Sequence, residues 1–248
     1  MMKACIFLDG ENFRHSLTKL FPESFNPLDY LPKDADWTGF FDWVAEESMR
    51  EAGMHNGRRL RTYWYVVEEI DTWPPVISGK HFDRNTFERR HKKDLEQLVV
   101  RTGDFEDSID ELLMRKQSII NRFDGWHTFQ RGIVNRHNRI EFRRSGSITY
   151  NLFYKTFGHE KTVDVHMALD MVKLAGIYDV CLIMSGDQDY TPAAEAAKDM
   201  GKLVCNVSFA TREHGYLTNV TRRLNEVADW NFTVPFEQMC KFMQMEDR

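Results

Sequence analysis

The chain has 248 residues, of which 42% are hydrophobic, so it is long and apolar enough for one large domain or two small ones. Its 33 Lys and Arg residues against 38 Asp and Glu residues leave a net charge of -5, which does not by itself indicate a nucleic-acid partner. Because no run of 18 apolar residues occurs and the N-terminus soon becomes acidic, we expect neither a membrane span nor a signal peptide.

Apolar runs of strand length alternate with segments of helical periodicity along the chain. This alternation predicts an α/β fold, in which a mainly parallel central sheet carries helices on both faces. In chain order we expect a strand at 3–8, a helix from Phe13, a loop at 21–37, a helix from Thr38, a strand at 60–67, helices at 84–100 and 108–123, a strand at 148–154, a helix from about 162, a strand at 180–184, a helix ending at Gly201, a strand at 203–209, a helix at 212–228, a strand at 231–234 and a C-terminal helix at about 235–246.

Residues 71–155 are predicted to be a basic helical insertion within a single domain that spans residues 1–248. Between residues 113 and 155, nine Lys or Arg residues stand against two acids, and aromatic residues are interleaved among them. This pattern favours contact with RNA, since cations neutralise phosphates and rings stack on unpaired bases. A solvated helical face that pairs with acids elsewhere is the alternative. The basic residues predicted to contact RNA are Arg115, Lys116, Arg122, Arg131, Arg136, Arg139, Arg143 and Arg144.

The apolar run at residues 180–184 predicts a strand that is buried on both faces. It ends in the sequence SGDQD, after which Thr191 as N-cap and Pro192 in the first turn should open the next helix. Asp187 and Asp189 therefore follow the C-terminal end of a buried strand, which is the edge where open α/β sheets bind ligands.

Two further acids are predicted to meet this pair. Asp9 ends the first strand, and Asp164 lies in the first turn of the helix that leads into residues 180–184. If the first strand and residues 180–184 are neighbours in the sheet, all four carboxylates face one crevice. Carboxylates this close repel one another unless a cation lies among them, and ligand sets made only of oxygen suit Mg²⁺ or Mn²⁺ rather than zinc.

A divalent ion at this crevice would lower the pKa of a water molecule and hold a phosphodiester for in-line attack. Asn12 and Ser185 would position the water and the phosphate through hydrogen bonds. The structural alternatives are simple: Asp is common in turns, and an acid in the first turn of a helix is favoured by the helix dipole.

Three motifs in order along the chain resemble the NYN domain family, a LabA-like branch of the PIN-like nucleases: DGEN at 9–12, KTVDV at 161–165 and SGDQDY at 185–190. The resemblance covers residues 3–70 and 150–233 and does not cover the insertion. It implies a PIN-like three-layer α/β sandwich and a ribonuclease that depends on Mg²⁺ or Mn²⁺. Asp9, Asp164 and Asp187 would then bind the metal, with Asp189 joining them and Asn12 supporting them.

We therefore predict a metal-dependent endoribonuclease that acts on single-stranded or structured RNA. A non-cleaving RNA-binding or regulatory adaptor is the first alternative. A phosphatase or nucleotide hydrolase that uses the same acids is the second, and a DNA substrate stays open. Homodimer formation is also left open, and no membrane partner is expected.

The four cysteines, Cys5, Cys181, Cys205 and Cys240, show no CxxC spacing, and three of them lie in apolar runs. Buried free thiols are therefore predicted, in a reducing compartment such as the cytoplasm.

Overall fold

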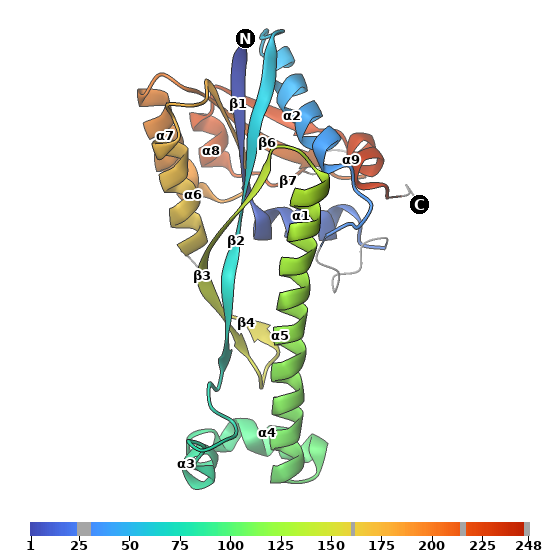
Figure 1. The fold of residues 1–248 in the computed structure, drawn as a ribbon, viewed down its shortest axis with the longest axis vertical. Coiled ribbons are helices and arrows are strands. Elements are labelled where there is room, and N and C mark those ends of the chain that lie inside the picture. The colour runs from blue at the N-terminus through green and yellow to red at the C-terminus, as the bar shows by residue number, and fades with distance from the viewer. Residues whose placement is uncertain (24–30, 160–161, 214–216, 246–248) are drawn as a thin grey trace. The chain divides into compact units, whose positions relative to one another are not determined.

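The computed structural model describes residues 1–23, 31–159, 162–213 and 217–245 (Figure 1). The chain forms two compact units. The first consists of Met1–Val66, Gln130–Ser145 and Thr162–Arg248, and the second of Val67–Phe129 and Gly146–Lys161. Of the helices that the structure describes, none has the length and apolar character needed to cross a bilayer.

The first unit is built on a mainly parallel sheet whose central strand is β1 (Met2–Asp9). This strand pairs in parallel with β2 (Gly57–Trp73) on one side and with β5 (Val180–Met184) on the other. The sheet continues in parallel from β5 to β6 (Leu203–Ala210) and from β6 to β8 (Trp230–Val234), while the short β7 (Leu217–Thr218) is antiparallel to β6. The neighbouring positions of β1 and β5 meet the condition on which the predicted crevice depends.

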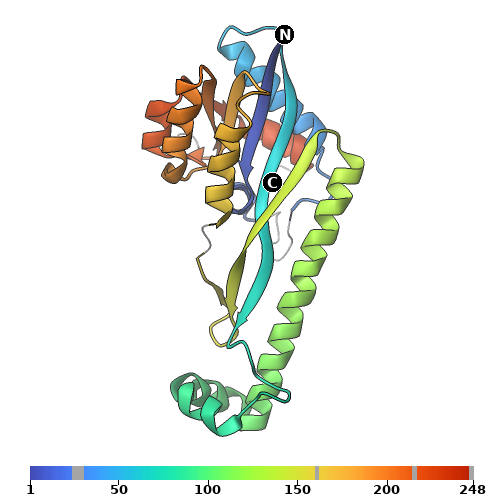
Figure 2. The same cartoon turned by 60° about the vertical axis from the view of Figure 1, so that its left-hand side comes forward.

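Helices cover both faces of this sheet, as Figures 1 and 2 show. The helices of one face are α1 (Gly10–Leu20), α2 (Trp37–Glu51) and α9 (Phe236–Met243). Those of the other face are α6 (Thr162–Lys173), α7 (Thr191–Asp199) and α8 (Arg222–Val227). On the α1 face the ring of Phe13 packs edge-on against Trp64, with 5.8 Å between centroids, and at 5.5 Å from Phe209. The predicted three-layer α/β fold with a mainly parallel sheet is confirmed.

The second unit has a core of its own. It contains α3 (Arg84–Arg90), α4 (Lys92–Thr102) and the first part of α5 (Phe105–Arg136). The later residues of β3 (Ile140–Asn151) pair antiparallel with β4 (Thr156–Phe157). Its buried core side chains are Ile77, Phe87, Leu95, Leu98, Ile109, Leu112 and Leu152.

Two predictions of helical structure in the middle of the chain were wrong in extent. The helix expected at 84–100 is two helices, which meet at His91, where φ is -112° and ψ is 23°. The helix expected at 108–123 runs from Phe105 to Arg136, and the strand expected at 148–154 begins at Ile140. An apolar stripe continues through α5 at Ile119, Phe123 and Ile133, all buried.

Near the C-terminus, the helix expected at 212–228 is reduced to Arg222–Val227, because residues 217–218 pair with β6 instead. Residues 214–216 lie outside the described chain. Thr191 is not the N-cap of α7: Tyr190 holds that position, and the Thr191 hydroxyl donates to the carbonyl of Gln188 at 2.7 Å. Of the four cysteines predicted to be buried, Cys5, Cys181 and Cys205 are buried, whereas Cys240 is only partly buried.

Candidate acidic site at the strand ends

Asp9 joins the end of β1 to the start of α1. Its side chain caps the helix, because one carboxylate oxygen accepts the backbone N–H of Asn12 at 3.0 Å. The other oxygen accepts the hydroxyl of Ser185 at 2.9 Å. The next residue must be glycine: a Cβ on Gly10 would lie 2.5 Å from the carbonyl oxygen of Tyr65 on β2. The DGEN motif therefore forms a tight turn in which both carboxylate oxygens of Asp9 accept hydrogen bonds. We call this turn, together with the side chain of Asp9, the acidic corner.

The loop after β5 is tied to the same corner. The backbone N–H of Gly186 donates to the side-chain oxygen of Asn12 at 3.2 Å, and that of Asp187 donates to the Ser185 hydroxyl at 3.1 Å. Asp187 in turn accepts the N–H of Asp189 at 2.9 Å and caps the short 3₁₀ helix η1 (Gln188–Tyr190). Two distant motifs thus share one hydrogen-bond network.

Tyr190 contacts Asp164 of the KTVDV motif. Its ring is fully buried, and its hydroxyl donates to a carboxylate oxygen of Asp164 at 2.8 Å. Burial raises the pKa of the Tyr190 hydroxyl, and the negative charges of Asp9, Asp164 and Asp187 raise it further. Tyr190 therefore joins the loop after β5 to the carboxylate of Asp164.

The electrostatics of Asp9 are unfavourable for an isolated carboxylate. Burial raises the pKa of Asp9 to about 6, even though the bonds from Asn12 and Ser185 favour the charged form. The nearby charges of Asp164 and Glu11 add to the increase. A divalent cation would relieve both the repulsion and the burial cost, and carboxylate oxygens are the donors that Mg²⁺ and Mn²⁺ prefer.

The chemistry of the predicted acids suits a divalent metal ion, but their positions do not form a complete metal site. Among the described residues, no three His, Cys, Asp or Glu side chains are grouped closely enough to hold a metal ion. The side chain of Asp189 is exposed on η1. A metal bound by three of these carboxylates would therefore require them to lie closer together than they do in this structure.

The basic residues predicted to contact RNA fall in both units, and protein groups hold most of them. In the second unit, Arg115 donates to Glu111 and to the carbonyls of Leu152 and Phe153, and Lys116 donates to the carbonyl of Pro75. The guanidinium of Arg122 lies 5.3 Å from the ring centroid of Trp126.

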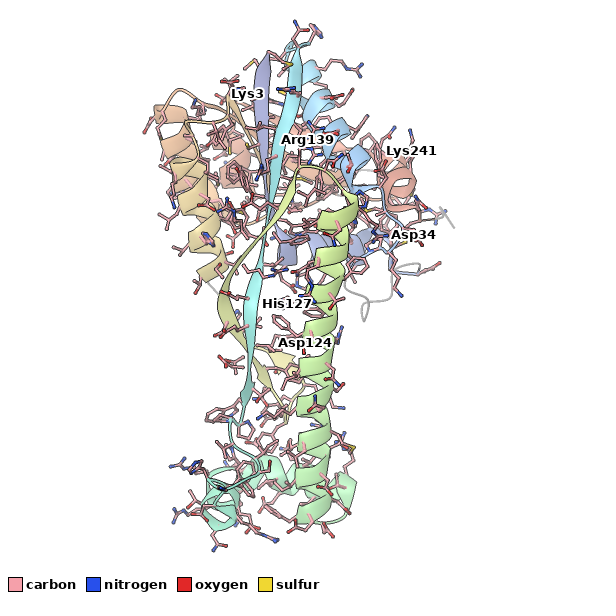
Figure 3. All side chains as sticks on the ribbon, viewed as in Figure 1. Lys3, Asp34, Asp124, His127, Arg139 and Lys241 are labelled. Carbon is pink, nitrogen blue, oxygen red and sulfur yellow. The ribbon has the colours of Figure 1, made fainter. Side chains whose placement is uncertain are left out.

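The other five basic residues belong to the first unit. Arg139, labelled in Figure 3, pairs with Asp42 at 3.1 Å. Arg136 donates to the carbonyl of Gly132, and Arg144 binds the side-chain oxygen of Gln130. Arg131 is exposed on α5. These contacts give several of the cations a structural role.

Arg143 differs because it belongs to a polar cluster on the α6 face. Its guanidinium lies 3.6 Å from the buried Asp170, which also accepts the hydroxyl of Tyr65 at 3.1 Å. His166 lies 3.5 Å from the same carboxylate. Tyr65 pairs with Asp9 in the register of β1 and β2, so the cluster is anchored beside the acidic corner. Neither this cluster nor a role for Tyr190 was predicted. The only sign of Tyr190 in the sequence is its position directly after the SGDQD loop.

The fold and site together define a PIN-like α/β sandwich with carboxylates at the C-terminal edge of parallel strands. The sequence profile of the NYN domain family matches residues 115–233, so the chain contains an NYN domain, as the motifs predicted. The match includes Asp164, Asp187 and Asp189; it begins inside the stretch expected to be an insertion, and Asp9 precedes it.

A crystal structure of a protein of unknown function from Vibrio parahaemolyticus aligns with 94% of this chain and 93% of its own, at 14% identity and a TM-score of 0.44. No curated protein matches the chain.

Proposed function

We propose that the protein is a metal-dependent endoribonuclease whose site comprises Asp9, Asp164 and Asp187, with Asp189 at its edge. The observation that supports this most strongly is the hydrogen-bond network of the site, in which Ser185 joins Asp9 to the loop of Asp187, and Tyr190 joins that loop to Asp164. The match of residues 115–233 to the NYN domain family, which suggests a PIN-like nuclease, also supports this proposal.

In this proposal, Asp9, Asp164 and Asp187 hold one or two Mg²⁺ or Mn²⁺ ions. Bound there, the ion supplies Lewis acidity toward a phosphodiester and lowers the pKa of water. The side chains of Ser185 and Asn12 tie the SGDQD loop, which carries Asp187, to the end of β1 that carries Asp9. Arg143, whose side chain is 29% exposed and also pairs with Glu141 at 2.7 Å, would contact a backbone phosphate in this proposal.

Replacing Asp187 with asparagine should lower cleavage of a single-stranded RNA in Mn²⁺ on the order of 100-fold, while RNA affinity is retained. The change keeps the cap on η1, because the amide oxygen of asparagine still accepts the N–H of residue 189. Gel-based cleavage rates measure the effect, and Asp199→Asn, an exposed change on α7, is the matched control. Equal rates for Asp187→Asn and the parent would contradict the proposal.

A non-cleaving RNA-binding adaptor is the second candidate. It is favoured by the hydrogen bonds that already occupy both oxygens of Asp9 and by the lack of a three-ligand group among the described residues. Failure of the parent protein to cleave any RNA in either Mg²⁺ or Mn²⁺, with RNA binding intact, would select this candidate.

Replacing Tyr190 with phenylalanine should weaken Mn²⁺ binding about 10-fold, because the partner that orients a metal ligand is lost while the ring packing stays. Titration calorimetry without RNA measures the affinity, and urea unfolding of the metal-free variant reports any purely structural effect. An unchanged Mn²⁺ affinity would show that the hydrogen bond to Asp164 has no part in metal binding.

A further inference from the structure

The second unit contains a cavity of about 300 Å³ lined by α5, the end of β3 and Lys155, which follows β3. Its walls include Glu111, Arg115, Ser118, Arg122, Tyr150 and Lys155. All of these belong to one unit, so the cavity is complete without the acidic site.

The charges of the cavity are not balanced. Its one carboxylate, on Glu111, accepts Arg115 at 2.9 Å and Arg101 at 2.8 Å, so two guanidinium groups already neutralise it. Arg115 is also held by two backbone carbonyls and is 9% exposed. The walls thus hold three cations, on Arg115, Arg122 and Lys155, against the single carboxylate of Glu111, so their net charge is positive, which suits an anionic ligand.

Lys155 is displayed at a backbone conformation that lysine rarely adopts. Its φ is 57°, in the left-handed region that favours glycine or asparagine. Its backbone N–H closes a turn on the carbonyl of Asn151 at 2.8 Å. The side chain is exposed, and among the described residues no carboxylate lies within ion-pair distance of its ammonium group. Strained backbone conformations of this kind cluster at sites that bind ligands, so the exposed ammonium group of Lys155 is a candidate ligand contact.

Aromatic side chains accompany these cations. Tyr150 is half-buried, with one side packed on Phe157 at 5.0 Å between centroids, and it also lines the cavity. Stacking surfaces beside positive charge are the combination by which proteins hold single-stranded nucleic acid.

We propose that this cavity is a nucleotide subsite for single-stranded RNA. Tyr150 stacks on one base, Lys155 and Arg122 contact the adjacent phosphate, and the hydroxyl of Ser118 donates to the same nucleotide. The inference deepens the proposed function, since the same RNA is the ligand. It assigns RNA binding in this unit to Lys155 and Tyr150, while Arg115 and Lys116 hold the fold.

The test measures binding of a fluorescent single-stranded RNA to the full chain carrying Asp187→Asn, so that cleavage does not interfere. Lys155→Asn fits the left-handed backbone and removes the charge. It should weaken binding about threefold to tenfold and reduce the slope of log K against log salt by about one. Tyr150→Leu should weaken binding on the order of 10-fold through lost stacking. Lys92→Asn, in the same unit and 76% exposed, is the matched control and should change the affinity less than about twofold.

Equal effects of Lys155→Asn and Lys92→Asn, or unchanged binding by both Lys155→Asn and Tyr150→Leu, would overturn the subsite. Displacement of the RNA by an equal concentration of a polyglutamate peptide would also overturn it, since the cavity would then select charge alone. Thermal unfolding of Tyr150→Leu checks that the unit stays folded, and the salt slope of Lys155→Asn does not depend on that variant. RNA cleavage by the parent chain decides the proposed function separately, whatever these binding results are.

Discussion

Replacing Asp9 with asparagine should stabilise the metal-free protein by about 3 kcal/mol near neutral pH and, in the same variant, reduce RNA cleavage on the order of 100-fold. The stability gain follows from the pKa of Asp9, which burial raises from 3.8 to about 6. Above pH 6 the native state must hold a buried, repelled charge that asparagine lacks. Asparagine keeps the bond from Asn12, because its oxygen accepts that N–H, and its amide donates to the Ser185 oxygen, which reverses the bond that Ser185 donates in the parent.

The gain should depend on pH in a defined direction. Because the folded pKa of Asp9 lies above the unfolded one, the native parent holds its proton more tightly and loses stability as the pH rises from about 4 to about 6. The advantage of Asp9→Asn should therefore be absent below about pH 4 and full above about pH 7. Urea unfolding in a chelator at several pH values measures it, with Asp199→Asn as the control. A destabilised Asp9→Asn variant at neutral pH would mean that the charge of Asp9 is compensated within the fold.

Replacing Arg59 with methionine should cost on the order of 3–5 kcal/mol of folding free energy. The side chain of Arg59 is fully buried in the first unit and donates to Asp42 at 2.7 Å and to the carbonyls of Arg139 and Asn138. Burial lowers the pKa of Arg59, against the raising effect of Asp42. Methionine keeps much of the volume but removes the donor to one oxygen of Asp42 and to the carbonyl of Asn138. The other oxygen of Asp42 still pairs with Arg139, and the carbonyl of Arg139 still accepts the N–H of Thr62.

The neighbouring Arg58 provides the control for this prediction, because it is exposed. Arg58→Met should change the stability by less than about 0.5 kcal/mol. Both variants are compared by urea unfolding at one pH. A loss for Arg59→Met no greater than that for Arg58→Met would show that the buried ion pair contributes nothing net to the first unit.

The sheet, and the meeting of the loop after β5 with the end of β1, could be predicted from the sequence because both depend on local patterns. A buried apolar run followed by polar residues defines β1 and β5 without any tertiary information, and the parallel arrangement follows from the alternation with helices. The pairing of these strands, Ala4 with Val180 through Leu8 with Met184, then brings Asp9 and Ser185 within hydrogen-bond distance.

The partners of long side chains could not be predicted in the same way. A run of arginines looks like an RNA-binding surface, yet Arg139 meets an aspartate contributed by α2, nearly a hundred residues away. Arg115 donates to the carbonyls of Leu152 and Phe153, which follow β3. Since the partners are distant in sequence, neither pairing leaves a local pattern. The dense charges of α5 also hid the apolar stripe that extends this helix to Arg136.

Tyr190 was missed for a related reason. In the sequence Tyr190 is a single aromatic residue between a loop and a helix, and this position predicts only that the ring is buried. Only the fold shows that its hydroxyl reaches Asp164, 26 residues earlier, and lies in the field of Asp9 and Asp187 as well.

A crystal of the protein soaked in Mn²⁺ and measured at the manganese absorption edge would test whether the separated acids form one divalent-cation site. We expect an anomalous peak with the carboxylate oxygens of Asp9, Asp164 and Asp187 about 2.0–2.4 Å from the ion. A saturated soak that leaves the hydrogen bonds of Asp9 to Asn12 and Ser185 in place, with no peak beside these residues, would contradict the nuclease proposal.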